Sequence, residues 1–99
     1  MNLKLYISDK AKEQIKDLKY NKGFLKQYKS VKKALSLLEN NPRHPSLQSH
    51  RFYSLKGPNG EKVFEAYAEQ NTPAAYRIFF YYGPDKREIS IISIEHHPD

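Results

Sequence analysis

Two apolar runs near the end of the chain constrain its fold more than any other feature. Residues 75–82 read AYRIFFYY and residues 89–94 read ISIISI, and both are rich in the aromatic and β-branched residues that favour strands. A Gly83-Pro84-Asp85 turn separates them. A connection this short implies that the two strands are antiparallel neighbours. Because both runs are apolar at consecutive positions, we expect the strands to be central and at least partly covered on both faces.

The first half of the chain predicts a short strand followed by two helices. Apolar and polar residues alternate over residues 3–7, which favours a strand. A helix is expected from residue 9 to residue 20, because Ser8 is a good N-cap. A second helix is expected over residues 24–39, where four apolar residues repeat at helical spacing and form one stripe. These four residues are Tyr28, Val31, Leu35 and Leu38.

A loop that contains Pro42 and Pro45 ends the second helix, and the periodicity then changes from helical to alternating. Strands are expected over residues 50–55 and 63–69, before the two apolar strands. The predicted order is therefore β-α-α-β-β-β(-β), an α+β arrangement in which two N-terminal helices pack on an antiparallel twisted sheet. A chain of 99 residues is expected to form a single domain, residues 1–99.

The charge of the chain favours an anionic partner. The chain carries 17 Lys and Arg against 11 Asp and Glu, a formal net charge of +6, which suits RNA, DNA or an acidic protein. No run approaches the roughly 18 apolar residues of a membrane span, so we expect no membrane partner. The chain has no cysteine, and its start lacks the features of a signal peptide, so we expect a cytoplasmic protein.

Arg77 stands inside an apolar strand, where charged residues are uncommon. Alternation gives Arg77 and Tyr81 one face of the strand and Ile78 and Phe80 the other. If Ile78 and Phe80 face the helices, Arg77 emerges on the open face of the sheet among aromatic rings. A guanidinium holds phosphate through paired hydrogen bonds and keeps its charge at any working pH. The alternative is a cross-strand ion pair, for which Glu65 is a candidate partner.

His96 and His97 follow the last strand and are candidate acid–base residues. Histidine donates or accepts a proton near neutral pH, as acid–base cleavage of a phosphodiester requires. Ile92 and Ile94 share the parity of His96, so His97 is expected on the open side if these isoleucines belong to the core. The alternative is a polar chain end. We expect no metal site, because neighbouring strand residues point apart and no third ligand accompanies them at zinc spacing.

Four further residues are candidates for binding RNA. Arg51 and Lys56 lie on or beside the first strand after the helices, where they either hold phosphates or guard an exposed edge strand. Arg43 lies in the proline-bounded loop and is a weaker candidate for a ligand contact. Tyr81 shares the predicted face of Arg77, and aromatic rings stack on bases, although packing in the core is the alternative for any one of them.

The whole layout resembles the RelE/ParE superfamily of bacterial toxins, which are the toxin halves of type II toxin–antitoxin pairs. The resemblance covers nearly all of the chain and rests on the order of elements and on three segments. These segments are Leu55-Lys56-Gly57, residues 76–81 (YRIFFY) and residues 92–97 (ISIEHH). In that family the elements L-K-G, Y-R-x-x-(Y/F) and a terminal I-x-H recur. The resemblance implies the fold of RelE.

The resemblance also implies roles for individual residues. Arg77 matches the family arginine that stabilises the scissile phosphate in the nuclease branch, and His96 or His97 occupies the place of the C-terminal acid–base residues. Lys56, with Arg51 upstream, falls near the basic residues that hold RNA. No cofactor is implied.

Members similar to RelE cleave mRNA within the ribosome, and members similar to ParE poison DNA gyrase instead. Both are neutralised by a small antitoxin, usually encoded beside them. We therefore expect a toxin that acts as a metal-independent endoribonuclease on ribosome-bound mRNA and inhibits translation, with a cognate small acidic antitoxin as its partner. Two alternatives stay open: a gyrase inhibitor without nuclease activity, and a non-toxic relic that only binds an antitoxin or RNA.

Overall fold

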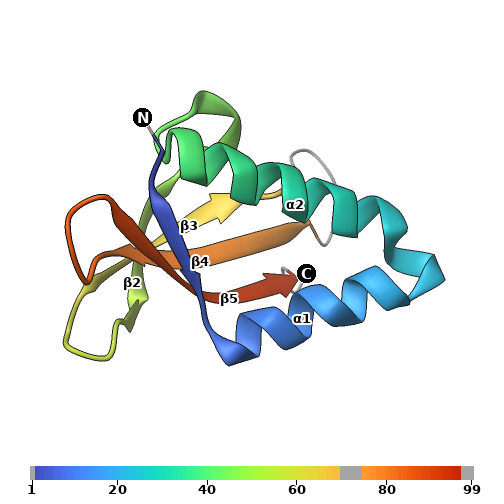
Figure 1. The fold of residues 1–99 in the computed structure, drawn as a ribbon, viewed down its shortest axis with the longest axis horizontal. Coiled ribbons are helices and arrows are strands. Elements are labelled where there is room, and N and C mark those ends of the chain that lie inside the picture. The colour runs from blue at the N-terminus through green and yellow to red at the C-terminus, as the bar shows by residue number, and fades with distance from the viewer. Residues whose placement is uncertain (1, 70–74, 97–99) are drawn as a thin grey trace.

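Two helices cover one face of a five-stranded sheet in the computed structural model, which describes residues 2–69 and 75–96 (Figure 1). The elements are β1 (Lys4–Ile7), α1 (Asp9–Tyr20), α2 (Leu25–Asn40), β2 (His50–Lys56), β3 (Lys62–Tyr67), β4 (Tyr76–Tyr82) and β5 (Glu88–His96). The predicted α+β order of elements is confirmed, with all the later strands present. Neither helix in the described ranges is long and apolar enough to cross a membrane.

The strands lie in the order β1-β5-β4-β3-β2. From β2 to β5 each strand is antiparallel to its neighbour, whereas β1 is parallel to β5. The sheet is therefore mixed, and the predicted antiparallel pattern fails at one edge. Short connections favour antiparallel pairs only between strands that follow one another, and β1 pairs with the last strand of the chain instead of the next one.

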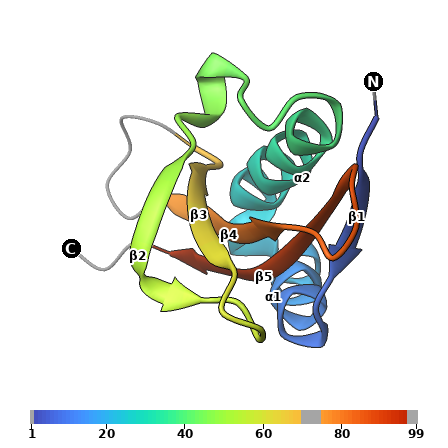
Figure 2. The same cartoon turned by 90° about the vertical axis from the view of Figure 1, so that its left-hand side faces the viewer.

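The main core lies between the helices and the sheet (Figure 2). Val31 and Leu38 of α2 are fully buried against it, and Tyr28 and Leu35 of the same predicted stripe are partly buried beside them. From the sheet, alternate residues of β4 point towards the helices, as the parity of the sequence predicts. In β5 a bulge at Ile92 shifts the alternation, so Ile91 and Ile94 both enter the core and Ile92 does not. The buried residues of the two strands on this side are Ile78, Phe80, Ile89, Ile91 and Ile94.

A second, smaller apolar cluster lies on the opposite face of the sheet. Val63 and Phe79 are buried although alternation points them away from the helices, and the rings of Phe52 and Phe79 meet edge to face with centroids 4.8 Å apart. β4 is therefore covered on both faces over Ile78–Phe80, as the continuous apolar run predicts. The rest of this face, which we call the open face, carries the polar groups described below.

Residues at and near the start of helix α1 form hydrogen bonds with the edge of β5 where β5 extends beyond the end of β1. The β1–β5 ladder ends at Ile7 and Ile91. Further along, the Ser8 hydroxyl donates to the carbonyl of Ile92 at 2.7 Å, and the backbone N–H of Ile94 donates to the side-chain oxygen of Gln14 at 2.8 Å. The Ser8 oxygen also accepts from the N–H of Ala11, so Ser8 is the N-cap that the sequence predicts. These bonds satisfy an exposed strand edge and hold its end beside the helix.

Gly57, the last residue of the Leu55-Lys56-Gly57 segment, and Gly60 both lie in the turn between β2 and β3. The geometry of this turn explains why both positions are glycine. Gly60 has a φ of +83°, a conformation that side chains with a Cβ rarely adopt. At Gly57, an added Cβ would lie 2.9 Å from the Cβ of Glu61, which is too close for any real contact. Glu61 in turn accepts a hydrogen bond from the backbone N–H of Asn59 at 2.7 Å. The tight turn therefore requires glycine at both positions.

We predict that Leu38→Ala lowers the free energy of unfolding by about 2–5 kcal/mol, because Leu38 is fully buried and its removal leaves a cavity between α2 and the sheet. Leu25→Ala is the matched control in the same helix. Leu25 is 51% exposed, so its loss is expected to cost about 0.5 kcal/mol or less. Urea unfolding followed by circular dichroism measures both, and equal losses would contradict the position of the core.

Candidate functional site

Side chains from three neighbouring strands meet on the open face of the sheet. The register places His50 of β2 opposite Glu65 of β3, and Tyr67 of β3 opposite Arg77 of β4. Directly opposed residues of an antiparallel pair point to the same side. His50, Glu65, Tyr67 and Arg77 therefore form one group, which we call the open-face cluster.

A buried carboxylate joins the members of this cluster. Glu65 accepts from Arg77 Nη1 at 2.9 Å through one oxygen and lies 2.8 Å from His50 Nε2 through the other. The Glu65 side chain is only 3% exposed, and a buried carboxylate requires such partners to offset its lost hydration. The cross-strand ion pair between Arg77 and Glu65, one of the two alternatives that the sequence leaves open, is thus present.

The histidine and the arginine are both held by further contacts. The Arg77 guanidinium lies over the ring of Tyr67, 4.7 Å from its centroid, and the His50 ring is 5.6 Å from the same centroid. His50 Nδ1 lies 2.9 Å from the carbonyl oxygen of Gln48. Both ring nitrogens of His50 therefore face acceptor oxygens, and both bonds form together only when each nitrogen carries a proton.

The cluster still offers donors to a ligand. A guanidinium has five N–H donors, and only Nη1 of Arg77 bonds to Glu65. Arg77 Nε is buried without a hydrogen-bond partner among the described residues, while 22% of the side chain remains exposed. The His50 side chain is 46% exposed. An anion on the open face can thus reach the exposed part of the Arg77 guanidinium and the half-exposed His50 ring, whereas Glu65 is buried beneath them.

His96 lies on the other face of the sheet. It is opposite Tyr76, whose ring is 5.7 Å from the His96 ring, while Arg77 is opposite Glu95. His96 therefore shares the helix side with the core residue Ile94, as the parity argument expects, and it does not join Arg77. His97, which the parity argument favours for the open side, lies outside the described residues, and its role stays a prediction.

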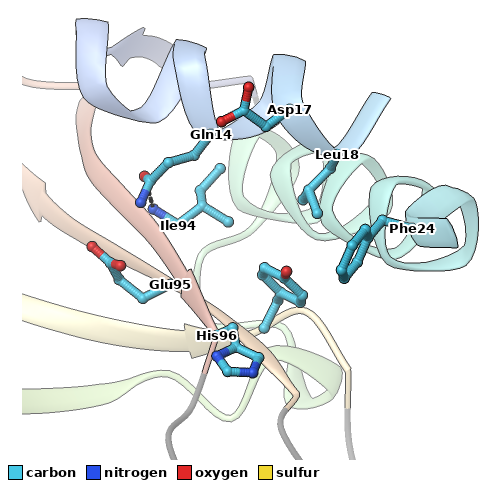
Figure 3. Close-up of a pocket in the computed structure, with 8 residues that line it drawn as sticks. Gln14, Asp17, Leu18, Phe24, Ile94, Glu95 and His96 are labelled. Carbon is cyan, nitrogen blue, oxygen red and sulfur yellow. Dashed lines mark hydrogen bonds between the residues drawn. The ribbon is translucent and has the colours of Figure 1, made fainter. Parts of the chain in front are cut away.

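His96 lines a cavity of about 460 Å³ between β5 and α1, with Gln14 and Asp17 on the helix side (Figure 3). Burial raises the pKa of the Tyr76 hydroxyl in this cavity, and the Glu69 carboxylate raises it further. Glu95 at the rim pairs with Lys10 at 3.1 Å. Two carboxylates on its lining make this cavity unsuited to phosphate.

The RNA-binding candidates are separated in space. Arg51 is opposite Phe64, whose ring stacks on the core residue Phe80, so it faces the helix side, with its guanidinium 4.6 Å from the Tyr53 ring centroid. Tyr81 is on the open face with Arg77, because alternation from Arg77 along β4 returns to the same side. Tyr81 therefore lies on the open face, and Arg51 does not.

Arg43 and Lys56 lie on different elements, and each has its own surroundings. Arg43 lines a cavity with Tyr82 and the loop over residues 83–88, where burial raises the pKa of the Tyr82 hydroxyl although the nearby charge of Arg43 opposes this rise. Lys56 ends β2 and is opposite Lys62 beside the turn. Neither residue joins the open-face cluster.

His50 is the residue of the cluster that sequence reasoning missed. It begins the predicted strand over residues 50–55, and only its position opposite Glu65 marks it out. A bulge between Arg51 and Lys56 shifts the register, so counting back from the Lys56–Lys62 pair would put Tyr53, not His50, opposite Glu65. In the described part of the chain, no group of three or more His, Cys, Asp or Glu side chains could hold a metal ion.

No protein-family model matches the chain, and no curated protein matches it significantly in sequence. Solved structures match over nearly its whole length. A chain of the archaeal RelE–RelB complex from Pyrococcus horikoshii OT3 superposes with a TM-score of 0.65 at 14% identity, covering 97% of this chain and 96% of that one. The YoeB dimer of Staphylococcus aureus gives 0.61 at 19% identity, covering 99% and 100%. The YoeB/ParE toxin of Agrobacterium tumefaciens gives 0.68 at 9% identity, covering 97% and 100%.

The chain has the fold of the RelE/ParE toxins. The fold that the resemblance implied is thus confirmed across both helices and all five strands. Within this RelE/ParE fold, the helices occupy one face of the sheet and leave the other face to the open-face cluster (Figure 2).

We predict that Glu65→Gln lowers the free energy of unfolding by about 1–3 kcal/mol, because Arg77 and His50 lose the negative charge that both contact. Glu95→Gln is the matched control. The Glu95 side chain is 41% exposed in its pair with Lys10, so the same change there is expected to cost about 1 kcal/mol or less. Urea unfolding near neutral pH compares them. A Glu65→Gln variant as stable as the parent would show that this carboxylate does not hold the cluster together.

A second prediction concerns the pH dependence of stability at Glu95. Burial alone would raise the pKa of Glu95, but hydrogen bonds from Lys10, Gln14 and Ser93 and the charge of Lys10 outweigh it and hold the pKa below its usual value of 4.5. Because the folded-state pKa is the lower one, the contribution of Glu95 is complete above the unfolded-state pKa and is lost as the pH falls through the folded value.

The difference in unfolding free energy between the parent and Glu95→Gln should therefore be constant above about pH 5.5 and shrink as the pH falls below 4.5. Urea unfolding at half-unit steps from pH 3 to 6 measures it. A difference that grows towards acid pH would contradict the direction of the pKa shift.

Proposed function

We propose that this protein is the toxin of a type II toxin–antitoxin module and that it cleaves mRNA on the ribosome. The observation that carries the proposal is the open-face cluster, in which an arginine and a histidine share one exposed face of a RelE/ParE fold. Both side chains retain exposed surface for a phosphate, and the chain has a net charge of +6, which favours a polyanion.

The proposed reaction is attack of an RNA 2′-hydroxyl on its own phosphodiester. The 2′-oxygen loses its proton to a base and forms a bond to phosphorus, while the bond from phosphorus to the 5′-oxygen breaks. The leaving 5′-oxygen takes a proton from an acid. The products are a 2′,3′-cyclic phosphate and a free 5′-hydroxyl, and no metal ion or cofactor takes part.

Arg77 and His50 supply two of the functions that this reaction needs. The free N–H groups of Arg77 stabilise the negative charge that develops on the phosphate oxygens. His50 is the proposed acid, because its half-exposed ring lies beside Glu65 on the same face as Arg77 and an imidazole can give a proton to the leaving oxygen. His97 is the proposed base, because the parity of the sequence predicts it on the side of Arg77.

The proposed partner is a small acidic antitoxin that neutralises the toxin. The complex of archaeal RelE with RelB supports such a partner for a chain of this fold. The charge of +6 favours an acidic segment that lies over the basic surface or in the groove beside the helices. Ribosomes place the proposed activity in the cytoplasm.

A second candidate function is inhibition of DNA gyrase without nuclease activity. The observation that favours it is the ion pair of Arg77 with Glu65, which occupies part of the guanidinium, together with the position of His96 on the opposite face. The likeness to a YoeB/ParE toxin is compatible with either target.

We predict that His50→Asn reduces mRNA cleavage by about 10²–10⁴-fold, the contribution typical of a positioned acid or base. The matched control is His96→Asn, which should cleave like the parent because His96 lies on the other face of the sheet. Arg77→Lys should also reduce cleavage, because lysine keeps the charge beside Glu65 but loses the fork that grips phosphate. Each variant is induced in bacteria without an antitoxin, and RNA ends are mapped after growth arrest.

The same induction experiment separates the alternatives. Arrest with intact mRNA and a DNA-damage response would replace the nuclease by a gyrase inhibitor. Normal growth with the parent chain would leave only a non-toxic module that binds an antitoxin or RNA. Full cleavage by His50→Asn, with loss of cleavage in His96→Asn, would overturn the assignment of the open face. Circular dichroism of each purified variant confirms that it folds.

A further inference from the structure

Two tyrosines flank a serine in a straight row across the open face. Ser90 of β5 is opposite Tyr6 of β1 on one side and Tyr81 of β4 on the other. The core residues Ile89 and Ile91 point to the helices, so Ser90 and both of its partners point away from them. The row therefore consists of Tyr6, Ser90 and Tyr81 in that order across three adjacent strands.

The spacing of this row leaves a slot between the two rings. Neighbouring strands lie about 4.8 Å apart, so the strands that carry Tyr6 and Tyr81 are separated by about 9.6 Å. A flat aromatic group between two rings needs about 7 Å, which is two stacking steps of about 3.4 Å. Serine is small enough to form the floor of such a slot without filling it.

A cavity occupies this position. Its volume is about 320 Å³, and its lining includes Tyr6, Tyr81, Ser90, Ile92 and Pro58. Pro58 comes from the turn between β2 and β3, which bends towards β5 on the open side (Figure 2). The volume is at the lower end of the range for small-molecule sites, about 300–1,000 Å³, and fits a single flat group better than an extended peptide.

Local contacts hold the slot in shape. The Tyr6 hydroxyl donates to Glu88 at 2.9 Å, which fixes that ring although 41% of the residue is exposed. The Ser90 hydroxyl donates to the carbonyl of Gly83 at 3.0 Å, so its oxygen can still accept a hydrogen bond from a ligand. Lys4 Nζ lies 5.0 Å from the centroid of the Tyr6 ring and brings positive charge to the rim.

The row lies on the same face as the open-face cluster and in line with it along β4. Arg77 and Tyr81 are four residues apart on one side of this strand, which corresponds to about 13 Å. An RNA strand whose phosphate lies at Arg77 and His50 can therefore place a neighbouring base near Tyr81. Aromatic side chains beside a cationic groove are the usual means of holding single-stranded nucleic acid.

We propose that Tyr6, Ser90 and Tyr81 form a subsite that holds one base of single-stranded RNA, stacked between the two tyrosine rings. The subsite rests on the proposed nuclease function and adds a place where the sequence around the cut is read. The Ser90 oxygen accepts a hydrogen bond from the base, which favours bases that present an amino group at that edge.

The test uses the full-length chain made by cell-free synthesis and a fluorescent ten-nucleotide 2′-O-methyl RNA, which has no free 2′-hydroxyl and is not cut. Fluorescence anisotropy measures the affinity. Tyr6→Leu and Tyr81→Leu should each weaken binding by about 5- to 150-fold, the range for loss of one stacked base. Tyr81→Phe, which keeps its ring, should bind like the parent, and Tyr6→Phe, which keeps the ring but loses the bond to Glu88, should weaken binding less than Tyr6→Leu. The control Tyr20→Leu changes an exposed tyrosine at the end of α1 and should leave affinity unchanged.

Two further readouts identify stacking as the cause. The dependence of affinity on salt should stay the same in the leucine variants, because they remove no phosphate contact. Ser90→Gln should weaken binding as well, since a longer side chain fills the floor while both rings remain. If a leucine variant fails to fold, Ser90→Gln still tests whether the slot between the two rings binds RNA.

The possible outcomes separate the subsite from the proposed function. If the parent cleaves mRNA and binds the oligonucleotide, but the leucine variants and Ser90→Gln bind it equally well, the subsite is wrong and the nuclease stands. If the parent neither binds nor cleaves RNA, both proposals fail. Loss of affinity for the antitoxin alone, with RNA binding intact, would make the row a protein-docking surface and overturn the subsite.

Discussion

The arrangement of the open face depends on one carboxylate. Glu65 lies on the strand between those of His50 and Arg77 and contacts both at hydrogen-bond distance, so a single buried carboxylate sets the positions of both side chains. Without it, each side chain would lose the partner that fixes its position on this face. The ion pair thus orients the guanidinium of Arg77, and it also occupies one of the donors that a phosphate would use.

Alternation and one bulge assign the side chains of β4 and β5 to the two faces of the sheet. Ile89 and Ile91 of β5 enter the core by alternation, and the bulge at Ile92 then changes the phase of the strand, so that Ile94 is the next isoleucine in the core. The register places His96 beside Tyr76 on the helix side and the Tyr6–Ser90–Tyr81 row on the open side. At Ile92 and Ile94 the backbone of β5 bonds to the Ser8 hydroxyl and the Gln14 side chain instead of to β1.

Local patterns predicted most of the fold, and long-range register limited the prediction of the site. The helix boundaries, the Ser8 cap and the helix-facing residues of β4 follow from periodicity and turn chemistry, which act over a few residues. The parallel pairing of β1 with β5 and the meeting of His50 with Glu65 depend on contacts between distant segments. The register shift in β2 puts His50 opposite Glu65, which no local pattern indicates, whereas Arg77 stands out as a charge within an apolar run.

The open-face cluster suits an anion in the proposed reaction when His50 acts as the acid. Arg77 and a protonated His50 then share the single carboxylate of Glu65, and the remaining positive charge suits the single negative charge of an RNA phosphodiester. In the proposed reaction His50 gives its proton to the leaving 5′-oxygen while the base takes the proton of the 2′-hydroxyl, so positive charge moves across the site and is not lost from it. The proposed contribution of Glu65 is therefore positional, because this buried carboxylate holds both side chains and does not itself contact RNA.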